Sequence, residues 1–146
     1  MDAQTVLAGR ADGATFDYDA IKRTPNTLLA HRVSWLAQRE DKQRAFVEAA
    51  LKGYFPKGRD IGSKSVLAEI SGEISLDRDA VAAFLSSDEG AESVRKPERA
   101  ARERGVQGVP HFDIAGTVIV GAQRPAVLRQ AIIEAVGRLA PKEPSL

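Results

Sequence analysis

The stretch from residue 108 to residue 125 reads GVPHFDIAGTVIVGAQRP, and it decides the fold class of this 146-residue chain. Residues 111–114 and 117–120 are two short runs with strand character, separated only by Ala115-Gly116. Two such runs around a two-residue connection that contains glycine predict a β-hairpin. Pro125 then stands where proline is best tolerated, at the first position of a helix. The chain is therefore predicted to end as strand, strand, helix.

The final helix has the clearest amphipathic pattern in the chain. Its apolar residues recur at helical spacing, at Leu128, Ala131, Ile132, Ala135, Val136 and Leu139. Such a helix can shield one face of the hairpin, but a two-stranded sheet is marginal in water and its edges need another strand. The pattern therefore predicts an incomplete sheet.

Upstream of the hairpin the spacing of apolar residues is helical. A helix is expected after the cap formed by residues 24–26, and a second one from about residue 42 to residue 55. The second helix carries two adjacent apolar stripes, one through Phe46 and one through Val47 and Leu51. Two stripes predict that this helix is buried on more than one side.

Two shorter helices and one charged helix are expected next. Ser63 or Ser65 opens the first and Asp77 opens the second. Ser86 to Glu89 reads as a capping box before a helix that extends to about residue 104. The charges of that last helix alternate in sign, so we interpret it as mostly solvated, with Pro97 kinking it or marking its start.

The predicted organisation is a mostly α chain of the α+β class in four parts. Residues 1–23 are polar and glycine-interrupted, and we interpret them as a lead-in. Residues 24–104 form a helical domain, residues 105–140 hold the hairpin and the last helix, and residues 141–146 are a tail.

Composition excludes several classes of function. The chain has no cysteine, so it carries no disulfide, thiolate metal site, cysteine nucleophile or dithiol of its own. A net charge of +1 gives no general attraction to nucleic acid or to an anionic membrane. Only two histidines are available for acid–base or metal chemistry at neutral pH. We interpret His31 as a packed or capping residue, and His111 with Asp113 offers too few ligands for a metal site.

Several separate motifs, taken in order, resemble one protein family. They are residues 25–32 (PNTLLAHR), 54–61 (YFPKGRDI), 84–90 (FLSSDEG), 108–114 (GVPHFDI) and 120–125 (VGAQRP). Together they resemble thioredoxin-fold proteins of the DsbA type, and most nearly the cytoplasmic FrnE-type oxidoreductases. Relatives of these include the 2-hydroxychromene-2-carboxylate isomerases and the kappa-class glutathione transferases. The resemblance covers about residues 15–137 and implies a helical insertion domain followed by the C-terminal half of a thioredoxin fold.

The resemblance also implies a segment that these 146 residues do not contain. In such proteins the first strand and helix carry a Cys-Pro-x-Cys pair, or a serine in the isomerases, and this segment would precede Met1. We therefore expect no catalytic residue in this chain. The missing strands are also the ones that would complete the sheet.

Three positions are implied to contact a ligand. Pro110 matches a proline that is cis and lies against the active-site thiol, and Val109 matches the residue whose backbone pairs with an extended substrate or with glutathione. Without a ligand, Pro110 is an ordinary turn proline that enters an edge strand. The counterpart of Asn26 lies near the thiol and the glutathione site, although a plain helix cap explains Asn26 equally well.

The turn before the last helix offers a fourth candidate site. Gly121, Ala122, Gln123 and Arg124 match the turn that, in glutathione-binding relatives, holds the charged end of the peptide at a helix N-terminus. Ala122 departs from the acidic or hydroxyl residue that those relatives often use, which favours an ordinary loop. Glutathione is thus the only cofactor that the resemblance suggests.

Three functions from different classes stay open. The first is a DsbA- or FrnE-like thiol–disulfide oxidoreductase family protein, truncated before its Cys-x-x-Cys segment and redox-inactive as this chain, whose family acts on thiol-containing proteins or peptides. The second is a cysteine-free module that binds a peptide or partner through the Val109–Pro110 edge and forms a homodimer through the incomplete sheet. The third is a glutathione-dependent isomerase or transferase. The N-terminus has neither the basic start nor the apolar core of a signal peptide, so a cytoplasmic location is expected.

Overall fold

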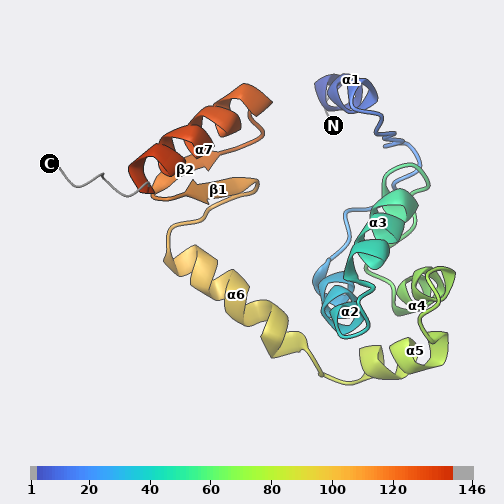
Figure 1. The fold of residues 1–146 in the computed structure, drawn as a ribbon. Helices are drawn as coiled ribbons and strands as arrows, with labels where there is room; N and C mark the ends of the chain where they lie inside the picture. The colour runs from blue at the N-terminus through green and yellow to red at the C-terminus, as the bar shows by residue number, and fades with distance from the viewer. Residues whose placement is uncertain (1–2, 140–146) are drawn as a thin grey trace, which may run out of the picture. The chain divides into compact units, whose positions relative to one another are not determined.

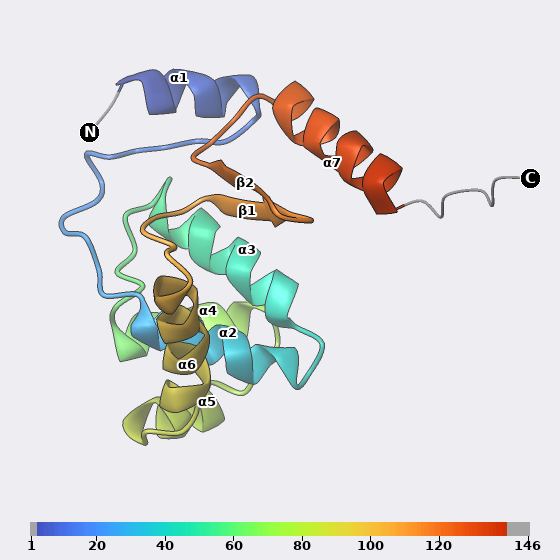
Figure 2. The same ribbon diagram turned by 90° about the vertical axis from the view of Figure 1, so that its left-hand side faces the viewer.

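The computed structural model describes residues 3–139 and divides the chain into two compact units, which meet in the sequence between Pro97 and Glu98 (Figures 1 and 2). The N-terminal unit contains α1 (Ala3–Ala11), α2 (Leu28–Gln38), α3 (Gln43–Tyr54), α4 (Lys64–Glu73), α5 (Arg78–Ser86) and the first half of α6 (Ala91–Glu103). The C-terminal unit contains the rest of α6, β1 (His111–Ile114), β2 (Thr117–Val120) and α7 (Pro125–Leu139). The predicted mostly α class is confirmed. The predicted tail, residues 141–146, lies outside the described residues.

The core of the N-terminal unit lies between α2, α3, α4 and α5. Each helix contributes apolar side chains from one face, among them Val33, Phe46, Leu67 and Leu85, all at most 1% exposed. Their spacing of three to four residues within each helix puts them on one stripe, as an amphipathic helix requires. These four helices therefore form a self-contained bundle.

The start of α5 is fixed by the predicted cap. The side chain of Asp77 accepts hydrogen bonds from the amides of Asp79 and Ala80, at 2.8 and 3.0 Å. Helix α4 begins directly after Ser63, but the Ser63 side chain caps no amide. The two predicted helix starts are confirmed, although only Asp77 acts through its side chain.

The predicted capping box at Ser86 and Glu89 is wrong. Ser86 is the last residue of α5, and its hydroxyl donates to the Ala82 carbonyl at 2.9 Å. The hydroxyl of Ser87 instead accepts from the Glu89 amide at 3.1 Å. The charged helix α6 then runs without interruption through Pro97 and has no buried residue among those described.

Helix α1 lies within the predicted lead-in, residues 1–23. Two further predictions need correction. Helix α3 is buried on one side only, since Val47 and Leu51 of its second stripe are 40% and 47% exposed. His31 is exposed and not packed. Helical spacing shows which side chains share a stripe, but not whether another element covers it.

The hairpin has the predicted bounds and a tight turn. Strand β1 pairs antiparallel with β2, in a register that places His111 opposite Val120 and Ile114 opposite Thr117. Both turn residues, Ala115 and Gly116, have positive φ, at 49° and 83°, which is the signature of a type I′ turn. The sheet has only these two strands within the described residues, so the predicted incomplete sheet is confirmed.

Helix α7 begins at Pro125, as predicted, and lies against one face of the hairpin (Figure 2). Arg138 donates to the Thr117 hydroxyl at 3.0 Å, and Ala131 and Ala135 are buried. No helix within residues 3–139 is long and apolar enough to cross a membrane.

Candidate functional site

The loop that precedes β1 starts from a defined helix end. The amide of Val106 donates to the Ala101 carbonyl at 3.1 Å, and the amide of Gly105 donates to the Arg102 carbonyl at 2.9 Å. Gly105 has a φ of 87°. This pair of bonds around a left-handed glycine is a Schellman motif, which ends α6 and redirects the chain toward Val109.

Val109 and Pro110 form the most exposed apolar corner of the C-terminal unit. The peptide bond between them is cis, and 89% of Val109 is exposed. The carbonyl of Pro110 accepts a hydrogen bond of 2.8 Å from the Gly121 amide. Pro110 is thus tied to the end of β2, whereas the backbone of Val109 makes no hydrogen bond to any described residue.

The hydrogen-bond pattern of the hairpin shows which backbone groups face outward. A two-residue turn makes Ile114 and Thr117 a hydrogen-bonded pair, and such pairs alternate along an antiparallel ladder. The Pro110–Gly121 bond fits this alternation. The N–H and C=O groups of Val109, His111 and Asp113 therefore point away from β2. They form a row of backbone groups that have no hydrogen-bond partner within residues 3–139, here called the β1 edge.

A groove of about 660 Å³ lies beside Val109 within the C-terminal unit. Its lining residues are Glu98, Ala101, Arg102, Val106, Gln107, Gly108 and Val109. The only ion pair on its rim, Arg102 with Glu98 at 2.8 Å, is well exposed on both sides and therefore weak. Sequence reasoning did not single out Ala101 or Arg102. A glycine followed by an apolar residue at the end of a helix, which is the sequence pattern of a Schellman motif, could have indicated this region.

The turn between β2 and α7 has partners of its own. The Gln123 side-chain amide donates to the Val120 carbonyl at 3.1 Å, which caps the outer edge of β2. Ala122 and Arg124 are exposed, and the Arg124 side chain makes no contact with a described residue that would aim it at an anion. This arrangement suits an ordinary loop before a helix better than a glutathione site.

Asn26 lies in the N-terminal unit and acts on its own helix. Its Oδ1 accepts a hydrogen bond of 3.0 Å from the Leu28 amide, at the first residue of α2. The side chain is exposed. A helix cap therefore accounts for Asn26 without a ligand.

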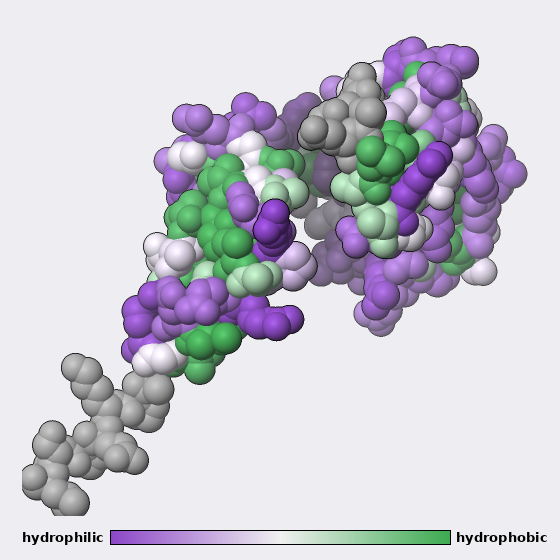
Figure 3. Space-filling view, turned by 90° about the horizontal axis from the view of Figure 1, so that it is seen from above, coloured by the Kyte–Doolittle hydropathy of each residue, from purple (hydrophilic) through white to green (hydrophobic). Residues whose placement is uncertain are grey.

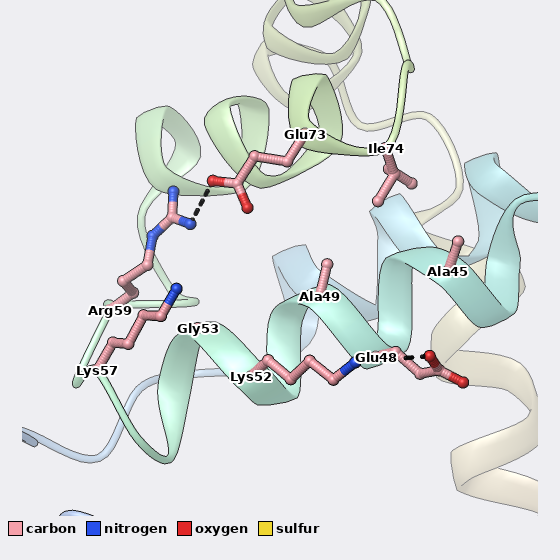
Figure 4. A pocket seen from close by; sticks show the side chains of 9 residues that line it. All are labelled: Ala45, Glu48, Ala49, Lys52, Gly53, Lys57, Arg59, Glu73 and Ile74. Carbon is pink, nitrogen blue, oxygen red and sulfur yellow. Dashed lines mark hydrogen bonds and ion pairs between the residues drawn. The ribbon is translucent and has the colours of Figure 1, made fainter.

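A second concave surface, of about 370 Å³, lies on the N-terminal unit between α3 and the end of α4 (Figure 4). Its cationic residues include Arg59, bound to Glu73 at 2.6 Å, and Lys52, 3.9 Å from Glu48. Lys57 is the third cation of the lining, so three cations face two carboxylates and the lining carries a formal excess of one positive charge. We interpret it as a solvated, ion-paired surface.

Comparisons with known proteins agree on one fold and one family. Residues 4–133 match the family model of the DSBA-like thioredoxin domain. The structure is similar to the crystal structure of a probable DsbA oxidoreductase from Streptomyces coelicolor, with a TM-score of 0.81 and 27% sequence identity. The match covers 97% of this chain and 62% of that chain, so this chain spans less than two thirds of the similar protein. No match is found among the curated proteins.

Proposed function

Because this chain belongs to the DSBA-like thioredoxin domain family, we propose that it provides the peptide-binding part of thiol–disulfide exchange. In this proposal the β1 edge at Val109 holds an extended segment of a thiol-containing protein. The observation that carries it is the exposure of Val109, at 89%, beside a proline whose carbonyl is held by Gly121. The FrnE type and a cytoplasmic location belong to the same proposal and are supported by the sequence resemblance.

The backbone geometry explains how an extended peptide would be held. Pro110 has no N–H, and its carbonyl is already bonded, so it offers no competing group beside Val109. The outward N–H and C=O groups of Val109 and His111 are spaced as in a strand edge, and a peptide can add to them as a further strand. Main-chain hydrogen bonds then give affinity with little dependence on peptide sequence.

The neighbouring groove supplies a place for one peptide side chain. Ala101 and Val106 make part of its lining apolar, whereas Arg102 and Glu98 stand at its rim. Alternate side chains of an added strand point to opposite sides, so one residue beside Val109 can enter this groove. We expect an apolar side chain to be preferred there.

The chemical step is not carried by these residues. Thiol–disulfide exchange requires attack by a thiolate, and the 146 residues hold no cysteine. The chain's own contribution is therefore to bind and orient the substrate segment. We expect no reduction of insulin and no oxidation of dithiothreitol above a blank, and measured turnover would contradict this part of the proposal.

Binding can be tested with a fluorescent ten-residue peptide that contains one reduced cysteine among strand-forming residues. Fluorescence anisotropy should show saturable binding, and Val109→Pro, which removes an outward N–H, should weaken it about tenfold or more. Gly137→Ala is the control, because Gly137 lies in α7, outside the groove lining, and a Cβ there meets no atom within 4 Å. Peptide should also slow amide exchange at Val109 and His111 in the unaltered chain, a readout that needs no variant.

Two results would count against the proposal. Equal binding by the unaltered chain and Val109→Pro, with no protection of the Val109 amide, would place the peptide elsewhere. A rise in melting temperature with millimolar glutathione would favour the glutathione-dependent function instead, since a ligand that binds only the folded state stabilises it.

A further inference from the structure

Most of the exposed apolar side chains lie on the C-terminal unit. Of the eleven large apolar residues that are exposed within the described chain, eight lie between residues 109 and 139. Figure 3 shows this surface on the left of the view. It belongs to the unit with the incomplete sheet, and the family resemblance assigns the strands that complete this sheet to a preceding segment. The helical bundle differs, because α2 to α5 enclose its core without that sheet.

A groove of about 490 Å³ lies on this bundle between α2 and α5, and it is here called the α2–α5 groove. Its apolar lining includes Leu36, Ala80 and Phe84. The charged residues of its lining are Arg39, Glu40, Asp77 and Glu89. Three carboxylates therefore face one guanidinium, and the lining has a formal excess of two negative charges.

The charged part of this lining faces water. Arg39 and Glu89 form an ion pair of 3.0 Å, and each of the two side chains is 53% exposed. Glu40 lies 3.7 Å from Lys42, and its side chain is 56% exposed. Charged residues are almost never fully buried unless they are paired, so a face that packs against another part of its own domain is poor in them. We therefore interpret the groove as a surface that a partner can reach.

Asp77 holds a carboxylate oxygen that is free to receive a cation. Its Oδ1 accepts from the amides of Asp79 and Ala80, at 2.8 and 3.0 Å, whereas its Oδ2 accepts from no described residue. The two amides already fix the side chain, so a ligand that binds Oδ2 loses little additional side-chain entropy. Glu40 adds to the negative charge, because its 3.7 Å contact with Lys42 is longer than a hydrogen bond.

The same part of the bundle already holds two guanidinium groups of its own. Arg39 lies over the ring of Trp35, 3.8 Å from its centroid, and Arg32 lies over the ring of Phe84, at 4.9 Å. Both also donate to oxygen atoms of Glu89, Arg39 to the carboxylate and Arg32 to the backbone carbonyl. Guanidinium groups favour such a combination of aromatic face and oxygen acceptor. This chemistry favours arginine as the ligand of the groove.

We propose that the α2–α5 groove binds an arginine-bearing segment of a partner protein. The aliphatic stem of the arginine lies along Ala80 and Phe84, and its guanidinium donates to Oδ2 of Asp77. Arginine suits this surface because it joins an apolar stem to a charged head. The negative lining is complementary to its charge. The proposal goes beyond the proposed function and does not depend on it, because it needs neither a thiol nor the β1 edge.

A peptide pair tests the ligand chemistry on the full 146-residue chain. The probe is a short peptide of leucine, alanine and arginine without cysteine. Its control carries citrulline in place of each arginine, because citrulline has nearly the same shape and no charge. Fluorescence anisotropy of the labelled peptides should show saturable binding of the arginine peptide and about tenfold weaker binding of the citrulline peptide.

Trp35 provides a second readout that needs no label. It is the only tryptophan in the chain, and its ring is stacked on that of Phe84, with 6.3 Å between the centroids. Phe84 lines the groove. Unlabelled arginine peptide should therefore change the emission of Trp35, and the citrulline peptide at the same concentration should change it less.

A charge substitution that keeps the helix cap tests the role of Asp77. Asparagine caps a helix about as well as aspartate, so Asp77→Asn removes the charge and keeps α5 intact. The Kd for the arginine peptide should rise about threefold or more. Asp79→Asn is the matched control, because Asp79 is an exposed acid of the same helical turn and does not line the groove.

A second pair of variants fills the groove from within. Ala80→Arg places a guanidinium of the chain itself beside Asp77 and should abolish binding of the peptide. Ala82→Arg is the matched control, because it adds the same charge at an exposed position of α5 outside the groove lining. Circular dichroism should show the same helix content in all four variants.

Each outcome decides for or against this site. Absence of saturable binding, or equal binding of the arginine and citrulline peptides, overturns the proposal. Equal affinities in Asp77→Asn and Asp79→Asn, or in Ala80→Arg and Ala82→Arg, place the peptide elsewhere and also overturn it. Val109→Pro should leave binding of the arginine peptide unchanged, and Asp77→Asn should leave binding of the cysteine peptide unchanged. The failure of one proposal is therefore distinguishable from the failure of the other.

Discussion

The carbonyl oxygen of Pro110 lies 2.8 Å from the amide nitrogen of Gly121, and this hydrogen bond extends the ladder of the hairpin one step beyond its strands. Gly121 reaches the position with a φ of 80°, which is strained for residues with a side chain. The bond fixes the direction of the chain at Val109. A substitution at Gly121 should therefore alter the backbone at the candidate binding edge.

Gly121→Ala is expected to destabilise the hairpin by about 1–2 kcal/mol, the cost of a left-handed residue with a Cβ. Amide exchange at β1 and β2 should become faster, and peptide binding should weaken. Gly137→Ala is the control, because Gly137 lies within α7 and a Cβ there meets no atom within 4 Å. Alanine in a helix interior should stabilise α7 by up to about 1 kcal/mol. Unchanged exchange in Gly121→Ala would mean that the Pro110–Gly121 bond does not organise this edge.

Arg32 is the one buried cation among the described residues, and it holds the end of α5. It is 4% exposed, and its guanidinium donates to the carbonyls of Phe84, Ser87 and Glu89, at 2.7 to 3.0 Å. Arg32→Met keeps the apolar stem but removes this donor from the carbonyls of Ser87 and Glu89, whereas the Phe84 carbonyl still accepts from the Ser87 amide and hydroxyl. The free energy of unfolding should fall by about 2–4 kcal/mol.

The control for Arg32 is Arg44→Met on the same bundle. The Arg44 side chain is 92% exposed, and its ion pair with Glu48 is of the surface kind. Its loss should change the unfolding free energy by about 0.5 kcal/mol or less. Urea denaturation of both variants measures the two losses of stability. Equal midpoints would show that the carbonyls at the end of α5 find other partners.

The caps of α4 and α5 give a second matched pair. Asp77→Ala removes a side chain that accepts from two amides of α5, and should cost about 1 kcal/mol. Ser63→Ala removes an N-cap residue whose side chain caps no amide of α4. Its cost should be clearly smaller. Thermal denaturation followed by circular dichroism compares the two, and a larger loss for Ser63→Ala would contradict this assignment.

Local chemistry explains which elements could be predicted from the sequence. The hairpin follows from two strand-like runs around a two-residue connection that contains glycine, in which Gly116 takes its positive φ freely and Ala115 is held at positive φ by the turn. The start of α5 follows from Asp77, whose side chain accepts from the first amides of the helix. The start of α7 follows from Pro125, because proline is well tolerated at the first position of a helix. The candidate binding edge at Val109 is predicted only through the resemblance of residues 108–114 to a family motif, because no single residue there carries distinctive chemistry.

The predictions that failed depend on packing between elements. Ser86 lies in the last turn of α5 because Phe84 and Leu85 are held in the core, so its hydroxyl reaches back to Ala82 and not forward. Val47 and Leu51 share a stripe but have no covering element. The groove beside Val109 is formed by a helix end and a loop, and no local sequence pattern predicts that the two enclose a groove.

Asp60 should make the stability of the N-terminal unit depend on pH in the acidic range. Its pKa is held below the ordinary value, first by a hydrogen bond of 2.9 Å from the Gly62 amide and then by the guanidinium of Arg23. A lowered pKa in the folded state means that the unfolded chain binds a proton first as pH falls. The stabilisation is therefore present above the ordinary carboxyl pKa, near 4, and is lost as pH falls through the folded value.

The comparison of the unaltered chain with Asp60→Asn isolates this contribution. Urea denaturation should show a stability difference between them at pH 5 to 7 that shrinks as pH falls below the ordinary carboxyl pKa toward the folded value. Arg23→Met should remove only part of the difference, because the Gly62 amide still stabilises the carboxylate. A difference that stays constant down to about pH 3 would show that Asp60 acts through its shape and not through its charge.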